Sequence, residues 1–111
     1  ADRINAAHRL ARLTGATVVL KGAGTLVCHP GGEPWRNTTG NPGMAAPGMG
    51  DVLSGIIAAL LVQGMAAEQA AMTGVWLHGA AADAAVAAGA GPAGLMASEV
   101  ILAARRLLNR A

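Results

Sequence analysis

The sequence contains no Phe and no Tyr, and Cys28 is its only cysteine. A single thiol excludes an internal disulfide and a cysteine-based metal cluster. The shortage of aromatic rings argues against single-stranded nucleic acid as a partner, because proteins that bind it stack the bases on aromatic side chains. The apolar residues are mainly Ala, Val, Leu, Ile and Met. We therefore expect a core of closely packed helices and a short sheet, with Cys28 buried in it.

Charge is sparse as well. The formal net charge is +2 at pH 7, and the basic residues are dispersed along the chain, so we predict no nucleic-acid surface. The longest apolar run, around residues 55–62, is far shorter than the roughly 20 residues that a membrane span requires. The start of the chain has no signal-peptide pattern. We expect a cytoplasmic protein that binds no membrane.

The apolar pattern predicts an α/β fold within one domain or part of one, over residues 1–111. Apolar positions at helical spacing predict a helix over residues 2–13 and another from about residue 51 to Gly64. We also expect a helix over residues 68–87, whose alanine-rich end is helix-prone, and a last helix through residue 108, which we expect Ser98 to cap. Runs rich in β-branched residues predict strands at residues 17–20 and 25–28. Residues 34–50 have no apolar period and many turn formers, which is typical of a functional loop.

The end of this loop, residues 41–51, is rich in glycine and leads directly into the second helix. The first N–H groups of a helix have no partner inside the helix, and the helix dipole adds partial positive charge there. Gly48 and Gly50 would let the backbone approach a ligand closely. The pattern predicts an anion site suited to phosphate.

Asp51 has two interpretations at this point. A carboxylate beside a phosphate site repels the ligand unless it takes part in the chemistry, for example as the base that accepts a proton from a hydroxyl during phosphoryl transfer. The alternative is a helix N-cap, which contributes about 1 kcal/mol. The bare Gly-x-Gly-Asp pattern does not separate the two interpretations.

Lys21 is the only lysine, whereas arginine fills every other basic position. A chain that otherwise uses Arg could keep Lys where a compact ammonium is needed, and the end of a strand is a frequent place for ligand contacts in α/β folds. The alternative is a surface lysine without a function. Thr25, four residues later, either contacts phosphate or simply favours the strand.

The remaining polar candidates are less specific. His78 is a lone histidine on a helix of small residues, and a core position with its hydrogen bonds satisfied is a more frequent role than catalysis. Met44 and Met49 are expected to line a pocket or to fill gaps in the core. Trp35 is expected to cover a hydrophobic edge. Polar side chains that could reach a substrate are Asn37, Thr38 and Thr39.

Together these motifs resemble the ribokinase-like family, in which a Gly-x-Gly-Asp loop opens a helix and supplies the catalytic base. The resemblance is closer to one branch, the NAD(P)H-hydrate dehydratases, and covers nearly the whole chain. The residues that carry it are Leu20-Lys21-Gly22-Ala23-Gly24-Thr25, Trp35, the run Asn37-Thr38-Thr39-Gly40-Asn41-Pro42-Gly43-Met44-Ala45, the run from Gly48 to Ile57, and Leu77-His78-Gly79-Ala80-Ala81.

The resemblance implies the C-terminal portion of a ribokinase-like three-layer fold, a central sheet flanked by helices, with the first half of the sheet upstream. Some relatives also carry an N-terminal epimerase domain. The implied reaction converts hydrated NADH or NADPH (NADHX, NADPHX) back to NADH or NADPH, by phosphorylation of the ring hydroxyl and loss of phosphate. The implied phosphate donor is ADP in bacterial members and ATP in eukaryotic ones, and the implied cation is Mg²⁺.

The resemblance also implies residue roles. Asp51 is expected to contact the hydrated nicotinamide and to act as the base, and Asn41 is expected to contact substrate. Pro47 departs from the family pattern, which more often has a small residue there, and its missing N–H is expected to remove one phosphate contact. The residues expected to contact the AMP part of the nucleotide are Lys21, Gly22, Ala23, Gly24, Thr25 and Gly50.

Two other functions remain open from the sequence. One is a ribokinase-like kinase for a small alcohol, sugar or vitamin precursor, which has the same Gly-x-Gly-Asp loop. The other is a non-catalytic nucleotide-binding fragment in which Asp51 only caps the helix. In each case we expect an unpaired sheet edge and exposed apolar helix faces, and therefore self-association or pairing with the missing upstream half.

Overall fold

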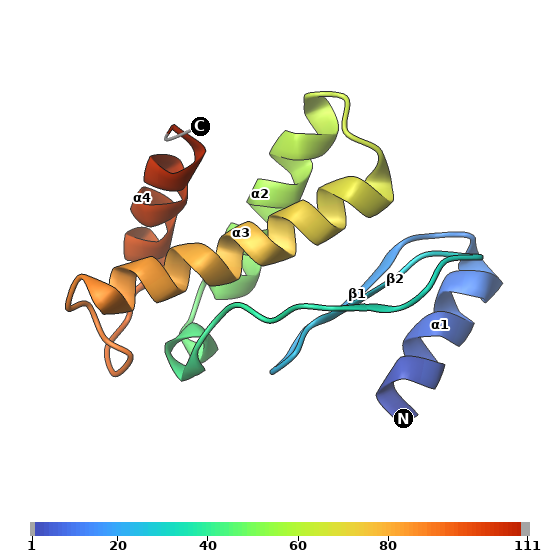
Figure 1. The fold of residues 1–111 in the computed structure, drawn as a ribbon, viewed down its shortest axis with the longest axis horizontal. Coiled ribbons are helices and arrows are strands. Elements are labelled where there is room, and N and C mark those ends of the chain that lie inside the picture. The colour runs from blue at the N-terminus through green and yellow to red at the C-terminus, as the bar shows by residue number, and fades with distance from the viewer. Residues whose placement is uncertain (1, 110–111) are drawn as a thin grey trace.

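The computed structural model describes residues 2–109, which form three layers (Figure 1). Helix α1 covers one face of a three-stranded sheet. The other face carries helices α2 and α3, and α4 packs on α3. The bounds are α1 Asp2–Thr14, β1 Val18–Leu20, β2 Leu26–Cys28, β3 Trp35–Arg36, the 3-10 helix η1 Pro42–Ala45, α2 Met49–Val62, α3 Ala67–Ala87 and α4 Ala97–Leu108. The predicted α/β fold with helices on both faces of a sheet is confirmed.

The sheet is antiparallel, in the order β1-β2-β3. Its central strand β2 is buried along its whole length, because successive side chains point to opposite faces and both faces are covered. Val27 packs toward α2 and α3, in a cluster with Leu53 and Val75. Cys28 points the other way and packs with Ala7 and Ala11 of α1. Burial raises the pKa of the Cys28 thiol, and its predicted core position is confirmed.

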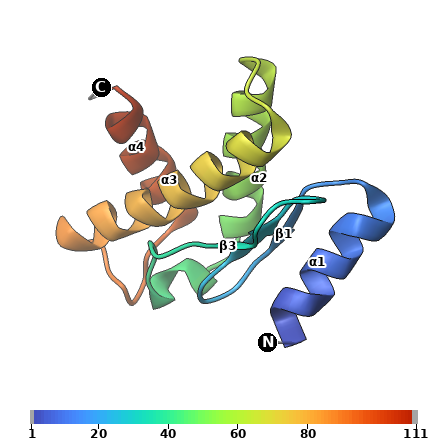
Figure 2. The ribbon, with the colours of Figure 1, turned by 45° about the vertical axis from the view of Figure 1, so that its right-hand side comes forward.

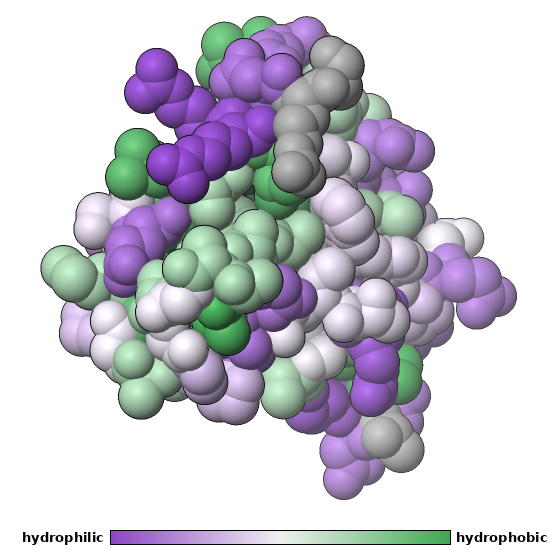
Figure 3. Space-filling view, turned by 60° about the vertical axis from the view of Figure 1, so that its left-hand side comes forward, coloured by the Kyte–Doolittle hydropathy of each residue, from purple (hydrophilic) through white to green (hydrophobic). Residues whose placement is uncertain are grey.

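Small residues let the helices pack closely. At Gly74 of α3, an added Cβ would lie 2.7 Å from Cγ1 of Ile57 on α2, a distance that packed side chains do not tolerate. Much of the helical core is alanine, including Ala81 and Ala82, both fully buried. These close helix contacts account for the alanine- and glycine-rich composition of the chain. Over the face shown in Figure 3, strongly hydrophobic residues appear as separate spots among alanine, glycine and polar side chains.

The helix bounds largely match the predicted ones. The first helix ends at Thr14, where Gly15 adopts a positive φ of 70° and its N–H donates to the carbonyl of Ala11, the expected chemistry of a glycine after a helix. The prediction that Ser98 caps the last helix is wrong. The N-cap is Met96, whose backbone N–H donates to Glu99 Oε1 at 2.8 Å.

The segment predicted to be an irregular loop contains two short elements, β3 and η1. Trp35 of β3 pairs with Val27 and packs against its cluster, so it covers a hydrophobic edge as expected. Figure 2 shows η1 beneath α3, beyond the end of the sheet. Across residues 2–109, no helix is long and apolar enough to cross a membrane.

Candidate functional site

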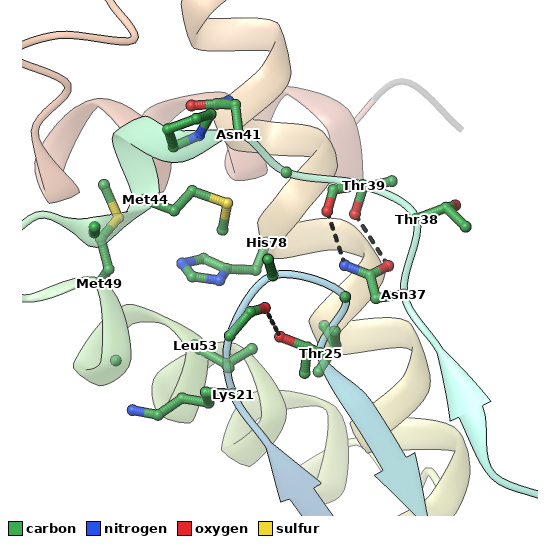
Figure 4. A pocket seen from close by; sticks show the side chains of 18 of the residues that line it. Lys21, Thr25, Asn37, Thr38, Thr39, Asn41, Met44, Met49, Leu53 and His78 are labelled. Atoms are coloured by element: carbon green, nitrogen blue, oxygen red, sulfur yellow. Dashed lines mark hydrogen bonds between the residues drawn. The ribbon is translucent and has the colours of Figure 1, made fainter. Parts of the chain in front are cut away.

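A cavity of about 840 Å³ lies where the sheet meets the helices (Figure 4). Its walls are the turn between β1 and β2, the segment from β3 through η1, the first turn of α2 and the middle of α3. Residues far apart in the chain thus form one site. The lining residues are Lys21, Gly22, Ala23, Gly24, Thr25, Asn37, Thr38, Thr39, Gly40, Asn41, Pro42, Met44, Ala45, Ala46, Met49, Gly50, Leu53, Val75 and His78.

One end of the cavity is built for an anion. The Lys21 ammonium lies against the backbone of Gly50, where an added Cβ would be 2.7 Å from Nζ. Gly48 is the N-cap of α2 with a φ of 85° and offers no side-chain cap. The N–H groups of Gly50 and Asp51 donate no hydrogen bond within residues 2–109. Since Lys21 is the only charged side chain in the described wall, helix dipole and ammonium together favour a phosphate here.

Most carbonyl groups of the turn from Lys21 to Thr25 accept a hydrogen bond. The Arg3 guanidinium, on α1, donates to the carbonyls of Lys21 and Ala23, each at 3.3 Å, and the Thr25 hydroxyl donates to the carbonyl of Gly22 at 2.9 Å. Thr25 therefore closes the turn, a role that its position next to a strand did not indicate. The N–H groups of Gly22, Ala23 and Gly24 in this turn donate to no acceptor within residues 2–109.

The segment after β3 is fixed to α3 by a polar network. Asn37 is buried, and its Nδ2 donates to the carbonyl of Thr39 at 3.1 Å. The Thr39 hydroxyl lies 3.1 Å from Asn37 Oδ1 and 2.9 Å from the carbonyl of Trp76. Gly79 makes this approach possible, because an added Cβ would collide with Thr39. Asn37 and Thr39 thus shape the wall through contacts with protein, whereas Thr38 is exposed.

Asp83 of α3 is a site residue that the sequence analysis missed. Its Oδ2 accepts from the N–H of Gly40 at 2.9 Å, and its Oδ1 accepts from Asn41 Nδ2 at 2.8 Å. Asn41 in turn caps η1, since its Oδ1 accepts from the N–H of Gly43 at 3.0 Å. Asn41 lines the cavity as predicted, but both ends of its amide already hold the loop. A lone acid in the alanine-rich half of α3 was the available signal.

Asp51 is exposed and is the third residue of α2. Gly48 is the N-cap, so the interpretation of Asp51 as the cap is wrong. Its side chain does not line the cavity, although the backbone of the preceding Gly50 does. Gly50 therefore presents its backbone to the cavity, whereas Asp51 presents its carboxylate to the surface outside the cavity wall. Pro47 does not line the cavity either, so its missing N–H removes no donor from the wall.

His78 is buried but not satisfied. Its side chain is 5% exposed, and Nε2 is the one buried side-chain nitrogen or oxygen within residues 2–109 that has no hydrogen-bond partner. Burial, and then the neighbouring Lys21, lower the pKa of the imidazole. The expectation of a satisfied core histidine is wrong. Figure 4 shows His78 between Met44 and Leu53 at the cavity, and the prediction that Met44 and Met49 line a pocket is confirmed.

A resident metal is not supported by the described side chains. Residues 2–109 contain no cluster of three or more His, Cys, Asp or Glu side chains that could hold an ion. Mg²⁺ usually keeps several waters and binds through one or two carboxylates plus the phosphates of a ligand. The described cavity wall offers no carboxylate, so an ion here would be held by the phosphates of a ligand and by water rather than by an all-protein cage.

A family model described as NAD(P)H-hydrate dehydratase matches residues 1–103. The chain is 51% identical over 110 residues to the ADP-dependent (S)-NAD(P)H-hydrate dehydratase of Neisseria meningitidis, covering 99% of this chain and 37% of that protein. It is also 51% identical over 108 residues to the bifunctional NAD(P)H-hydrate repair enzyme of Vibrio cholerae, covering 97% of this chain and 22% of that protein.

Solved structures give the same answer. The ADP/ATP-dependent NAD(P)H-hydrate dehydratase of Bacillus subtilis, co-crystallised with ATP and Mg²⁺, matches with a TM-score of 0.88 and 32% identity, over 97% of this chain and 39% of that one. A ribokinase-like superfamily protein of Enterococcus faecalis matches with a TM-score of 0.75 and 34% identity, over 94% of this chain and 36% of that one.

The fold is therefore part of a ribokinase-like α/β/α fold. Within that class, the chain belongs to the NAD(P)H-hydrate dehydratase family. It spans 37% of the length of the N. meningitidis relative and 22% of the V. cholerae relative.

Proposed function

We propose that the protein containing this chain converts hydrated NADH or NADPH back to NADH or NADPH in a nucleotide-dependent reaction, and that the chain is the C-terminal part of its catalytic domain. The observation that carries the proposal is the anion end of the cavity, where the Lys21 ammonium meets the free N–H groups at the start of α2. Family membership supports hydrate repair over another phosphoryl transfer.

The nucleotide occupies the cavity in this proposal. Its phosphates lie at the anion end, against Gly50 and the turn formed by Lys21, Gly22, Ala23, Gly24 and Thr25. The N. meningitidis relative is named as ADP-dependent and the B. subtilis neighbour as ADP/ATP-dependent, and we propose ADP as the donor for this protein. Mg²⁺ bound through the phosphates and water would offset their negative charge.

Asp51 acts on the other reactant. Its exposed carboxylate stands one residue beyond Gly50, outside the cavity wall. We propose that it accepts the proton of the ring hydroxyl while the hydroxyl oxygen forms a bond to the terminal phosphorus of the nucleotide. The bond between that phosphorus and the nucleotide then breaks, and AMP leaves when ADP is the donor. In the second step the C–O bond breaks, phosphate leaves with the electron pair, and a proton lost from the adjacent ring carbon leaves the double bond.

Asn41 has a supporting part in this scheme. The amide holds the loop through Asp83 and Gly43 and keeps one N–H free for a ligand, because a primary amide carries two. We propose that this N–H contacts the substrate.

The test follows the recovery of NADH absorbance at about 340 nm from hydrated NADH, using the full-length protein with ADP or ATP. Asp51→Asn should lower kcat at least about a hundredfold while nucleotide binding is retained, because removal of a general base costs that much or more. Glu33→Gln, an exposed carboxylate outside the cavity wall, is the matched control and should keep wild-type turnover.

The same experiment separates the alternatives. A nucleotide-binding protein that restores no NADH but phosphorylates a small alcohol would be the ribokinase-like kinase. Binding of ADP that needs Lys21, without any turnover that needs Asp51, would indicate a non-catalytic nucleotide-binding protein. The sequence run from Asn41 to Ala45 and the family match favour the dehydratase.

We also propose that the rest of the catalytic domain covers the apolar surface left open here, and that the isolated chain self-associates. Leu13 on α1 is 75% exposed and Val62 on α2 is 88% exposed, and β1 is an edge strand of the described sheet. Repair of nicotinamide cofactors suits a cytoplasmic location, which we propose for the protein. Fractionation of cells that express a tagged full-length protein tests the location.

A further inference from the structure

The cavity contains one unexplained polar atom. His78 Nε2 is buried and has no partner within residues 2–109, and leaving a polar group in this state costs free energy. The imidazole lines the cavity together with Met44, Leu53 and Val75. These neighbours are apolar and offer no hydrogen bond. A ligand that enters this part of the cavity can supply a partner.

The cavity is divided by chemistry. Lys21 and the start of α2 form the anion end, and His78 with its apolar neighbours forms a second end that carries no charge. Figure 4 shows the two ends facing the same space. A nucleotide has the same division, with phosphates at one end and a flat heteroaromatic base, carrying hydrogen-bond donors and acceptors on its edge, at the other.

We propose that His78 hydrogen-bonds the edge of the nucleotide base, so that this residue determines affinity for the base; the proposal rests on nucleotide binding in this cavity. The imidazole is suited to hydrogen-bond the edge of a base, because its neutral form has one donor and one acceptor. The apolar neighbours supply surface for the faces of the base.

A contact between His78 and phosphate is less favourable. Burial and Lys21 both lower the pKa of His78, so the ring is neutral at pH 7 and offers a phosphate no charge. The ammonium and the free helix N–H groups attract the phosphates to the other end of the cavity.

The test compares two ligands by calorimetry on the full-length protein: ADP, and inorganic diphosphate as the probe without a base. His78→Leu should weaken ADP binding about tenfold, which is what the loss of one good hydrogen bond causes, and should leave diphosphate binding unchanged. His78→Gln, which keeps a donor and an acceptor, should recover part of the ADP affinity. His8→Leu on α1 is the control histidine variant.

Unchanged ADP binding in a folded His78→Leu protein would overturn the proposal, and so would an equal loss for ADP and diphosphate. A measurement on the unaltered protein covers the case of a variant that does not fold. The side-chain nitrogen resonances of His78 should shift with ADP and stay in place with diphosphate, whereas no shift with ADP contradicts the proposal.

The two proposals fail differently. If ADP binding depends on His78 but hydrated NADH is never restored, the function is wrong and the role of His78 stands. If the His78→Leu protein restores NADH from hydrated NADH at the wild-type rate and with the wild-type KM for ADP, the role proposed for His78 is wrong and the function stands. A full-length protein that binds no nucleotide rejects both.

Discussion

Gly50 occupies the place where two parts of the cavity meet, and its lack of a side chain is what allows the contact. The Lys21 ammonium lies where a Cβ would be, although a lysine side chain is flexible enough to move away. Substitution at Gly50 should therefore affect the position of a charge more than the stability of the fold. Few positions in this chain separate binding from folding so clearly.

Gly50→Ala should weaken ADP binding at least about tenfold, because the new methyl group displaces the Lys21 ammonium from the start of α2. Thermal unfolding should show no loss of stability, since helices favour Ala over Gly. Gly55→Ala is the matched control on the same helix, where an added Cβ meets nothing within 4 Å; it should raise stability by roughly 0.5–1 kcal/mol without changing ADP affinity. Parallel calorimetry and denaturation measure both effects, and unchanged ADP affinity in Gly50→Ala would contradict the assignment of Lys21.

His78 predicts a pH dependence of stability. Its pKa is lowered in the folded state by burial and by Lys21, whereas the unfolded chain has the ordinary value of about 6.5. Above that pH the imidazole is neutral in both states and contributes no pH dependence. Below it the unfolded chain takes up a proton that the folded protein refuses, so the free energy of unfolding falls as the pH falls, until the pH passes below the folded pKa.

Urea denaturation between about pH 7.5 and pH 5 measures the contribution of His78 to the free energy of unfolding. Wild-type protein should lose up to about 1.4 kcal/mol per pH unit more than His78→Leu below about pH 6.5, the limit for one proton. The two proteins share every other titrating group, so the difference between their curves isolates the contribution of His78. Parallel curves for wild type and His78→Leu would show that the buried ring titrates normally.

At the scale of elements, α3 is the support of the site. Gly79 lets Thr39 approach, His78 faces the cavity, and Asp83 holds the backbone at Gly40 and the side chain of Asn41. All three positions lie on one stretch of helix, which is covered by alanine-rich packing against α4. A rigid helix therefore fixes a loop that has little regular structure of its own, the usual way in which a scaffold positions a functional loop.

Asp83→Asn should destabilise the loop, because one amide cannot accept from both Gly40 and Asn41. If Asn41 turns its amide to compensate, the N–H of Gly43 loses its acceptor, so one half-buried donor remains unpaired at a cost of about 1 kcal/mol. The double variant Asp83→Asn with Asn41→Asp restores every pair, with the amide now on the helix and the carboxylate on the loop. Denaturation should show a lower free energy of unfolding in the single variant and its recovery in the double variant. Additive losses of stability would mean that the network is not coupled.

The elements that were predictable from the sequence are those that have a periodic pattern of their own. Helices α1 and α2 each repeat apolar positions, and Gly15 ends the first of them. By contrast, β3 has two residues and η1 four. They exist because Trp35 pairs with Val27 and because Asn41 is held by Asp83, contacts between distant residues that no local pattern contains.

The same distinction applies to the site. Lys21 and Gly50 were recognisable from composition and from the glycine-rich loop, and the structure places them in contact. Asp83 was missed because its partner lies 42 positions away. The cap interpretation of Asp51 failed because Gly48 adopts a left-handed conformation and starts the helix earlier. A choice between cap and base depends on where a helix starts, and the position of that start is the least predictable feature of a helix.

At the scale of the whole molecule, several large apolar side chains of the described chain are exposed on its surface. The start of α1 and the end of α4 lie on opposite sides of the molecule (Figure 1), and α1 forms one of its margins. Leu10 and Leu13 are 50% and 75% exposed on this helix, although a solvated helix face is normally polar. Leu10 and Leu13 are three positions apart and so share one face of the helix, which is the face that we propose another part of the protein covers.

The 111-residue polypeptide should therefore associate with itself, and α1 should be part of the contact. Sedimentation over a roughly hundredfold range of concentration should show a rise in mass, because association follows mass action. The double variant Leu10→Glu with Leu13→Glu should raise the dimer dissociation constant at least about tenfold, since two apolar side chains leave the contact and two like charges enter it. Arg9→Glu, also exposed on α1, controls for the added charge.

If the rest of the domain covers this face in the full-length protein, the leucine variant should instead lower the stability of that protein. A monomeric polypeptide and an unaffected full-length protein would together show that α1 is an ordinary solvated helix.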